Sequence, residues 1–264
     1  MFNNYRFNRI CKRIKELKIQ GATNVAKAAL RAYYIFPSAK TKKILMNLRP
    51  TEPMLSHVLH LADKKQKSEI LAHFSEAQDK INQQVFNLIK NNYVIFTHCH
   101  STNVVRALIY AKKHGKKFQV YNTETRPLYQ GRKTAHELSR AGIEVTNVVD
   151  SAAAIVIKSS SMVFLGADAL LKDSVINKVG SGMFTQIAND LGVPVYIIAD
   201  SWKYSHKKVK IEQRDFKEVW GTKQVHIKNP AFEPIEVKNI TKIVTEIGTM
   251  TYKDFLKKVS RRKD

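Results

Sequence analysis

The sequence Tyr93-Val-Ile-Phe-Thr-His-Cys-His-Ser-Thr102 decides the fold of this 264-residue chain. It opens with an uncharged run of high β-propensity, continues with small polar residues, and is followed by helical periodicity from Val104 and Val105. This order predicts a buried strand, a tight loop and the start of a helix. Cys99 then lies at the carboxyl end of a strand and beside a helix N-terminus, which is where open α/β sheets bind their ligands.

The residues after this stretch alternate between short β-rich runs and helical patterns. We expect strands at 93–97, 117–121, 143–149, 162–165 and 194–199, and helices near 103–114, 131–141, 152–160, 179–191 and 237–248. This βαβ rhythm predicts a doubly wound, Rossmann-like parallel sheet with helices on both faces over residues 92–264. A very basic tail, Lys257 to Lys263, follows the last predicted helix.

Residues 1–91 have helical spacing of apolar side chains almost throughout. Gly or Pro interrupts the pattern at 18–22, 36–38 and 49–53, which marks the boundaries between helices. The predicted fold class is therefore α/β, with a helical N-terminal domain over residues 1–91 and a Rossmann-like domain over residues 92–264.

The charge balance is strongly basic, with 45 Lys and Arg residues against 22 Asp and Glu residues and a formal net charge of +23. Such a charge is compatible with a polyanionic partner. The Lys-Lys pairs are, however, spread over the whole chain and form no continuous basic stripe with interleaved aromatic residues. The pattern favours a solvated basic surface and no nucleic-acid partner, although a polyanion-binding role stays open.

The cysteines, Cys11 and Cys99, lie in very different sequence contexts. They give neither a disulfide framework nor the spacing of zinc ligands, so we expect no metal site. The sequence contains no apolar segment of signal-peptide length near its start and nothing as long as a membrane span. We therefore expect a cytoplasmic protein without a membrane partner.

Chemically distinctive residues follow every predicted strand. The loops contain Thr97–Thr102, Asn122–Gly131, Asp150-Ser151, Gly166–Ala169 with Asn177-Lys178, and Asp200–Tyr204. Because the carboxyl ends of parallel strands share one edge of the sheet, these loops are predicted to form one pocket. His98 and His100 are expected to be packing or polar lining residues of that pocket.

Several of these motifs resemble one superfamily. Glu124-Thr-Arg-Pro127 with Gln130-Gly131, and Gly166-Ala-Asp168 with Asn177-Lys178, are similar to motifs of the α/β/δ regulatory subunits of translation initiation factor 2B, methylthioribose-1-phosphate isomerase and archaeal ribose-1,5-bisphosphate isomerase. The resemblance extends over most of the chain. Thr-His-Cys followed by Ser is most similar to the ribose-1,5-bisphosphate isomerases, and this implies that Cys99 and Asp168 are the catalytic pair.

The resemblance also implies the groups that hold the phosphates and hydroxyls of a sugar bisphosphate. These are Gln20, Gly21, Ala22, Arg49, Ser101, Asn177, Lys178 and Lys203. The implied reaction is the cofactor-independent conversion of ribose 1,5-bisphosphate to ribulose 1,5-bisphosphate, which feeds ribose from AMP and from nucleosides into carbon metabolism. A homo-oligomer, either a dimer or a hexamer, and a nucleotide activator are implied in the same way.

The reaction explains why a pair of groups would be needed. An aldose phosphorylated at its anomeric carbon cannot open its ring spontaneously, so an acid must protonate the ring oxygen while a proton moves from C2 to C1. We expect the helix N-terminus and nearby basic residues to lower the pKa of Cys99 toward the thiolate, and burial to keep Asp168 neutral. Cys99 would then serve the carbon atoms and Asp168 the oxygens, although which acts first as acid stays open.

Departures from the isomerase pattern leave alternatives open. Gln20 stands where the isomerases usually have Arg, which would weaken one phosphate site. This feature and the basic tail favour a second hypothesis, a non-catalytic archaeal initiation-factor-2B-like regulatory protein that binds a sugar phosphate or nucleotide. A third hypothesis is methylthioribose-1-phosphate isomerisation, which needs only one phosphate site.

Overall fold

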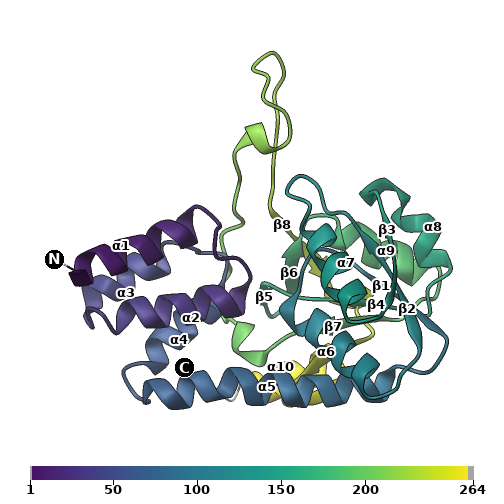
Figure 1. Ribbon diagram of the computed structural model, residues 1–264, viewed down its shortest axis with the longest axis horizontal. Coiled ribbons are helices and arrows are strands. Elements are labelled where there is room, and N and C mark those ends of the chain that lie inside the picture. Colours follow the sequence, from purple (N-terminus) through teal and green to yellow (C-terminus); the bar gives the residue numbers. More distant parts are fainter. Residues whose placement is uncertain (1, 261–264) are drawn as a thin grey trace.

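The structure, a computed structural model, describes residues 2–260. Its first part is helical and contains α1 (Phe2–Lys15), α2 (Ala22–Tyr33), α3 (Ala39–Met46), α4 (Pro53–Leu61) and α5 (Lys67–Leu88). In Figure 1, α1 to α4 form a group at the left, and α5 runs beneath this group and the sheet. The helical N-terminal part expected from the sequence is therefore present.

Local sequence explains where several of these helices begin. The Ser38 side chain accepts a hydrogen bond from the Thr41 amide at the start of α3, and Pro53 occupies the first turn of α4. Gln66 and Glu69 form a capping box at α5. These residues either pair the amides that a helix start leaves without partners or, in the case of proline, remove one of them.

The central sheet has seven strands in the order β10-β9-β7-β4-β1-β2-β3. The strands are β1 (Tyr93–Thr97), β2 (Phe118–Thr123), β3 (Glu144–Val148), β4 (Met162–Leu165), β7 (Val195–Ile198), β9 (Lys242–Thr245) and β10 (Gly248–Met250). Neighbouring strands are parallel except β9 and β10, which are antiparallel. The other helices are α6 (Thr102–Lys113), α7 (Gln130–Arg140), α8 (Ala153–Lys158), α9 (Ser181–Asp190) and α10 (Tyr252–Val259).

Helices cover both faces of this sheet. On one face, Ile81 of α5 packs with residues of α6 against Phe164 of β4. On the other face, Phe184 of α9 and Phe255 of α10 share a core with residues of β4 and β7. This is the doubly wound, Rossmann-like arrangement that the sequence predicts, and the α/β fold class is confirmed.

Helix α5 takes part in the cores of both halves of the molecule. Near its start, Ile70 and Phe74 pack among residues of α2 and α4. Further along, Ile81 and Val85 belong to the core of the sheet. The domain border at residue 91 therefore stays a prediction, because the helix before it is shared.

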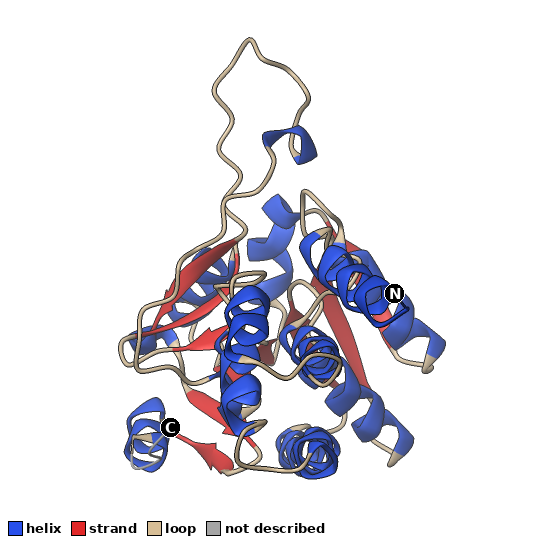
Figure 2. Cartoon of the chain, turned by 90° about the vertical axis from the view of Figure 1, so that its left-hand side faces the viewer, coloured by secondary structure: helices blue, strands red, loops and turns tan. Residues whose placement is uncertain are grey.

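A smaller antiparallel sheet, which the sequence analysis missed, is formed by β5 (Ala169–Leu170), β6 (Ser174–Lys178) and β8 (Phe232–Glu236). Asn177 and Lys178 therefore lie at the end of a strand and not in a loop. Between η2 (Ser201–Lys203) and β8 the chain forms a long arm, residues 204–231, which carries η3 (Phe216–Glu218). Figures 1 and 2 show this arm rising away from the rest of the molecule.

The helix predicted at 237–248 is wrong. This segment contains η4 (Val237–Asn239), strand β9 and the turn into β10. Its apolar residues have the spacing of one helix face, namely Ile240, Ile243, Val244 and Ile247. They are β-branched, however, and Ile243 and Val244 are fully buried where β9 pairs with β7. Packing at the edge of a parallel sheet therefore outweighs a spacing that also suits a helix.

The end of the chain is helical and basic. Lys257 and Lys258 of the predicted basic tail lie on α10, whereas residues 261–264 lie outside the described part of the chain. Over residues 2–260, no helix has both the length and the apolar character needed to cross a membrane.

Candidate active site

One cavity lies at the carboxyl edge of the sheet, and every residue predicted for the site lines it. From the sheet side come Cys99, Ser101, Asp168, Asn177, Lys178 and Lys203, and from the helical side come Gln20, Gly21, Ala22 and Arg49. We call these sets the sheet wall and the helical wall. Glu52, which also lines the cavity, is included in the helical wall.

Cys99 lies in the turn between β1 and α6 and has a φ of 64°, in the left-handed region. This conformation costs energy for any residue other than glycine, so surrounding groups must hold it. The Cys99 amide donates to Oγ1 of Thr125 at 3.0 Å, and its carbonyl accepts from Oγ1 of Thr134 at 2.7 Å. The turn is thus fixed from both sides at a residue that lines the cavity.

The pKa of Cys99 shifts in the direction opposite to the one expected from the sequence. Burial raises the pKa of the thiol to about 11 and outweighs the opposing effect of Lys178. The expectation of a lowered pKa is therefore wrong, because moving a thiolate out of water costs more than a nearby lysine recovers. Cys99 is a neutral thiol at neutral pH, and it can donate a proton before it accepts one.

Asp168 follows β4 and immediately precedes β5, and its amide donates to the carbonyl of Ile176 at 2.8 Å. Burial raises the pKa of its carboxyl group, as predicted, while Lys203, Arg49 and Lys178 act to lower it. Lys203 and Lys178 belong to the sheet wall, whereas Arg49 belongs to the helical wall. The carboxyl group of Asp168 is therefore the point at which the two walls interact electrostatically.

Lys203 is buried, and its ammonium group is held in place by the protein. Nζ donates to the Ala167 carbonyl at 2.6 Å and lies 3.5 Å from Oδ1 of Asn103. Burial lowers the pKa of Lys203, and the carboxyl groups of Asp168, Asp200 and Glu52 oppose this effect. The lysine amine is thus held in a fixed position at the cavity.

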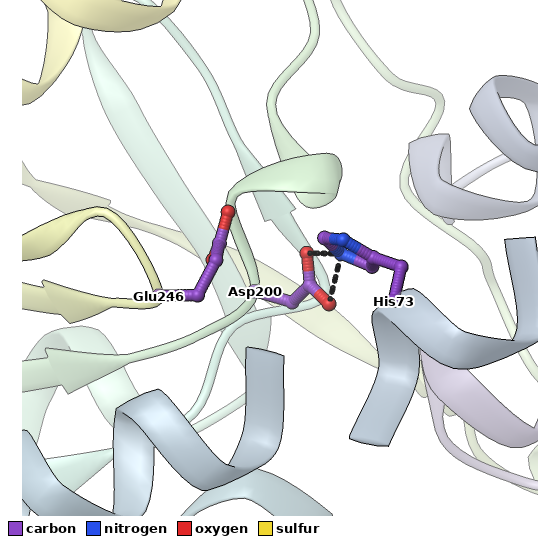
Figure 3. A group of neighbouring side chains, drawn as sticks. All are labelled: His73, Asp200 and Glu246. Atoms are coloured by element: carbon purple, nitrogen blue, oxygen red, sulfur yellow. Dashed lines mark hydrogen bonds and ion pairs between the residues drawn. The ribbon is translucent and has the colours of Figure 1, made fainter. Parts of the chain in front are cut away.

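The turn that carries Lys203 is supported by His73, Asp200 and Glu246 (Figure 3). Nε2 of His73 lies 3.1 and 3.2 Å from the Asp200 carboxylate oxygens, and Glu246 accepts a hydrogen bond from the Ser201 amide at 2.9 Å. The His73 ring also stacks on the Trp202 ring, with 3.4 Å between the ring centroids. The three side chains could each offer one ligand atom to a metal ion, since these atoms lie within 4.8 Å of one another. The Asp200 and Glu246 carboxylates also accept hydrogen bonds from the Trp202 and Ser201 amides, which fix the position of the Lys203 turn.

Arg49 and Glu52 form a buried ion pair in the helical wall. Nη2 of Arg49 lies 2.7 Å from Oε1 of Glu52, and Nε of Arg49 lies 3.5 Å from Oε2 of Glu212. Nη1 of Arg49 and both carboxylate oxygens of Glu52 make no hydrogen bond to the described part of the protein. Glu52 was not among the predicted site residues. The sequence did contain a signal, because Glu52 is an acid three residues after Arg49, an expected phosphate ligand.

Two helix N-termini also face this cavity. Gly21 precedes α2 with a φ of 82°, and within the described chain no side chain caps that helix. A Cβ added at Gly21 would lie 4.0 Å from Oγ1 of Thr102, at the start of α6. The Ser101 side chain already accepts a hydrogen bond from the Val104 amide at the start of α6. Uncapped amides at the start of a helix attract anions, so the start of α2 is suited to a phosphate.

Gln20 lines the cavity but already uses its side-chain amide. Nε2 of Gln20 donates to the Leu17 carbonyl at 2.9 Å. Asn177 likewise donates to Oγ of Ser181 at 2.9 Å. These amides hold the local backbone or a neighbouring side chain, and neither of them supplies a positive charge.

The histidines beside Cys99 are involved in hydrogen bonds. His98 is buried and its Nε2 lies 3.0 Å from the Val179 carbonyl, and burial lowers its pKa to about 4, so its ring is neutral. Nε2 of His100 lies 3.2 Å from Oε2 of Glu137. These contacts agree with the polar lining role that the sequence analysis assigns to both residues.

The sequence matches a known protein family and several named relatives. The family described as the Initiation factor 2 subunit family matches residues 10–252. The ribose 1,5-bisphosphate isomerase of Archaeoglobus fulgidus is 31% identical over 274 aligned positions, which cover 90% of this chain and 88% of that protein. The 5-deoxyribose 1-phosphate isomerase of Petrotoga mobilis is 34% identical, with 75% of this chain and 64% of that protein covered.

The fold also matches solved structures. The translation initiation factor eIF-2B of Pyrococcus horikoshii OT3 superimposes with a TM-score of 0.83 at 24% identity, covering 93% of this chain and 97% of that chain. At this level of identity the likeness concerns the fold. The sequence relatives carry the names of isomerases with different sugar-phosphate substrates.

Proposed function

Because the chain belongs to the Initiation factor 2 subunit family, we propose that it is a sugar-phosphate isomerase that converts ribose 1,5-bisphosphate to ribulose 1,5-bisphosphate. Relatives named as sugar-phosphate isomerases support the general activity. The observation that carries the choice of substrate is the single cavity, in which Cys99 and Asp168 lie with Arg49, Lys178 and Lys203 and with two helix N-termini. A substrate with two phosphate groups suits this supply of cations and amides.

The protonation states suggest how the pair divides the work. Cys99 begins as a thiol, so it donates its proton to the ring oxygen as the bond between that oxygen and C1 breaks. Asp168, as a carboxylate stabilised by Lys203 and Arg49, takes the proton from C2 and an enol forms between C1 and C2. Asp168 returns this proton to C1, and the Cys99 thiolate takes the proton of the C2 hydroxyl.

Both residues end the cycle as they began it. The ring oxygen gains one proton, the C2 hydroxyl loses one, and one proton moves from C2 to C1, so no oxidant or cofactor is needed. This assignment exchanges the roles expected from the sequence, because the raised pKa of Cys99 makes it an acid.

The test is a direct assay of the purified protein with ribose 1,5-bisphosphate, compared with 5-deoxyribose 1-phosphate and methylthioribose 1-phosphate. We expect the bisphosphate to have the highest kcat/KM, with or without adenosine monophosphate as activator. Cys99→Ser and Asp168→Asn should each lower kcat by about a hundred- to ten-thousandfold, since general acid–base catalysis is lost. Cys11→Ser and Asp173→Asn serve as matched controls.

A higher kcat/KM for one of the monophosphates would reject the substrate, and full activity of either catalytic variant would reject the pair. Gln20 favours the second candidate, a regulatory protein without catalysis, because its amide adds no charge to the helical wall. Binding of the bisphosphate without any turnover would support that candidate. Light scattering tests the proposed assembly as a dimer or hexamer.

A further inference from the structure

Glu52 is a buried carboxyl group that the proposed reaction does not use. It precedes α4 and is 2% exposed. Both of its oxygens lack a hydrogen bond to any residue in the range 2–260, and it lines the cavity. A buried carboxylate without hydrogen bonds is costly, so its retention in a binding site needs a reason.

The charges around Glu52 come from every side of the cavity. Arg49, on the turn before α4, forms the ion pair at 2.7 Å. Asp168 and Lys203 act on Glu52 from the sheet wall, and Glu212 acts from the base of the arm. Arg49 thus lies between two carboxyl groups, Glu52 and Glu212, which largely neutralise its charge before any phosphate arrives.

A phosphate dianion placed at Arg49 would meet the negative charge of Glu52 in a partly dry environment. Two negative charges that share one arginine repel strongly when water is excluded. Protonation of Glu52 removes the repulsion and provides an O–H donor for a phosphate oxygen. It also releases Nη2 of Arg49 from the ion pair, while Nη1 has no hydrogen-bond partner in the described protein.

We infer that Glu52 couples phosphate binding to proton uptake: it pairs with Arg49 in the free protein and takes up one proton when a phosphate group of the substrate binds there. The inference rests on the proposed function, since it assigns Arg49 to a substrate phosphate. The proton comes from solvent, and it leaves again when the product dissociates.

The acidity of Glu52 fits this role. Burial raises the pKa of its carboxyl group to about 7, although Arg49 opposes the shift. Glu52 therefore changes its protonation state near neutral pH. Below this pH the residue is already protonated and binding needs no further proton, whereas above it each binding event must take up one proton and affinity falls.

The experiment is calorimetric titration of the full chain with ribulose 1,5-bisphosphate, in buffers of different ionisation enthalpy, at pH 6, 7 and 8. For the wild type we expect proton uptake to approach one per site at pH 8. We also divide the wild-type affinity by the affinity of Glu52→Gln at each pH. This ratio should be about tenfold lower at pH 8 than at pH 6, since a single group of pKa near 7 changes binding by this factor. Glu236→Gln, which removes an exposed carboxyl group on β8, should behave as the wild type.

Absence of proton uptake in the wild type, or the same uptake in Glu52→Gln, would overturn the inference. The wild-type measurement does not depend on whether the variant folds. Because binding does not require turnover, normal proton uptake in a protein that lacks isomerase activity would reject the proposed function and leave the inference standing. Isomerase activity together with uncoupled binding would reject the inference alone.

Discussion

The sheet wall and the helical wall of the cavity are built by different means. In the sheet wall, Cys99 and Lys203 are fixed by hydrogen bonds to neighbouring loops. In the helical wall, Gly21 contributes the uncapped start of α2, and the charge of Arg49 is countered by Glu52. Under the proposed function, Cys99 and Asp168 of the sheet wall carry the chemistry, whereas Glu52 of the helical wall makes phosphate binding depend on pH.

The largest effect that tests this comparison is the reactivity of Cys99. In a Cys11→Ser background, Cys99 is the remaining cysteine, and its alkylation by iodoacetamide at pH 7.5 should be about 300-fold slower than in the urea-unfolded protein, because a pKa near 11 leaves so little thiolate. The rate should rise about tenfold per pH unit up to pH 9.5. A plateau below pH 9 would mean that the sheet wall stabilises a thiolate.

The second effect concerns Lys203, one of the two lysines of the sheet wall. Lys203→Met should lower kcat by about a hundredfold, the usual cost of removing one fixed electrostatic contact from an active site. Lys203 is the main cation that lowers the pKa of Asp168. Its loss should therefore raise that pKa and move the acidic limb of the kcat profile to higher pH. The exposed Lys158→Met is the control, and an unshifted limb would contradict the role of Lys203.

The third effect is steric and concerns how tightly the sheet wall is packed. A Cβ at Gly166 would lie 2.5 Å from Oγ of Ser101, so Gly166→Ala should lower the free energy of unfolding by about 1–3 kcal/mol. Denaturant unfolding measures this change. Ser159→Ala, at an exposed residue, is the control. Gly192→Ala would be less informative, because the positive φ of Gly192 strains any other residue. An unchanged free energy of unfolding would show that Ser101 and its neighbours can move to accommodate the added methyl group.

The smallest effect belongs to the helical wall. Gln20→Arg should lower KM for ribose 1,5-bisphosphate by about tenfold and leave kcat unchanged, since a charged hydrogen bond to phosphate contributes about 1.5–3 kcal/mol and part of this is lost in releasing Leu17. Gln119→Arg is the control, because it adds the same charge on β2 at a residue that does not line the cavity. A change in kcat, rather than KM, would contradict the expectation that the helical wall affects binding and not the chemical step.

The position of the site could be predicted from the sequence because it follows from topology. Cys99 and Asp168 follow different parallel strands, and parallel strands bring such residues to one edge whatever their separation in the chain. The family resemblance added the residues of the helical wall, such as Gly21 and Arg49, which strand ends alone do not indicate. Every one of these residues lines the same cavity.

Other features depend on packing and could not be predicted in this way. Residues 237–248 have apolar spacing that suits a helix or a strand, and pairing with β7 decides between them. The direction of the Cys99 pKa shift depends on how completely the thiol is removed from water, which sequence does not report. Glu52 gains its importance from Asp168 and Lys203, which are distant in sequence and close in space.

The long helix α5 has a mechanical consequence for the cavity. Its 22 residues span about 33 Å at 1.5 Å per residue, with Phe74 in the core of the helical group and Ile81 in the core of the sheet. A continuous helix resists bending, so it acts as a strut that sets the spacing between the two halves.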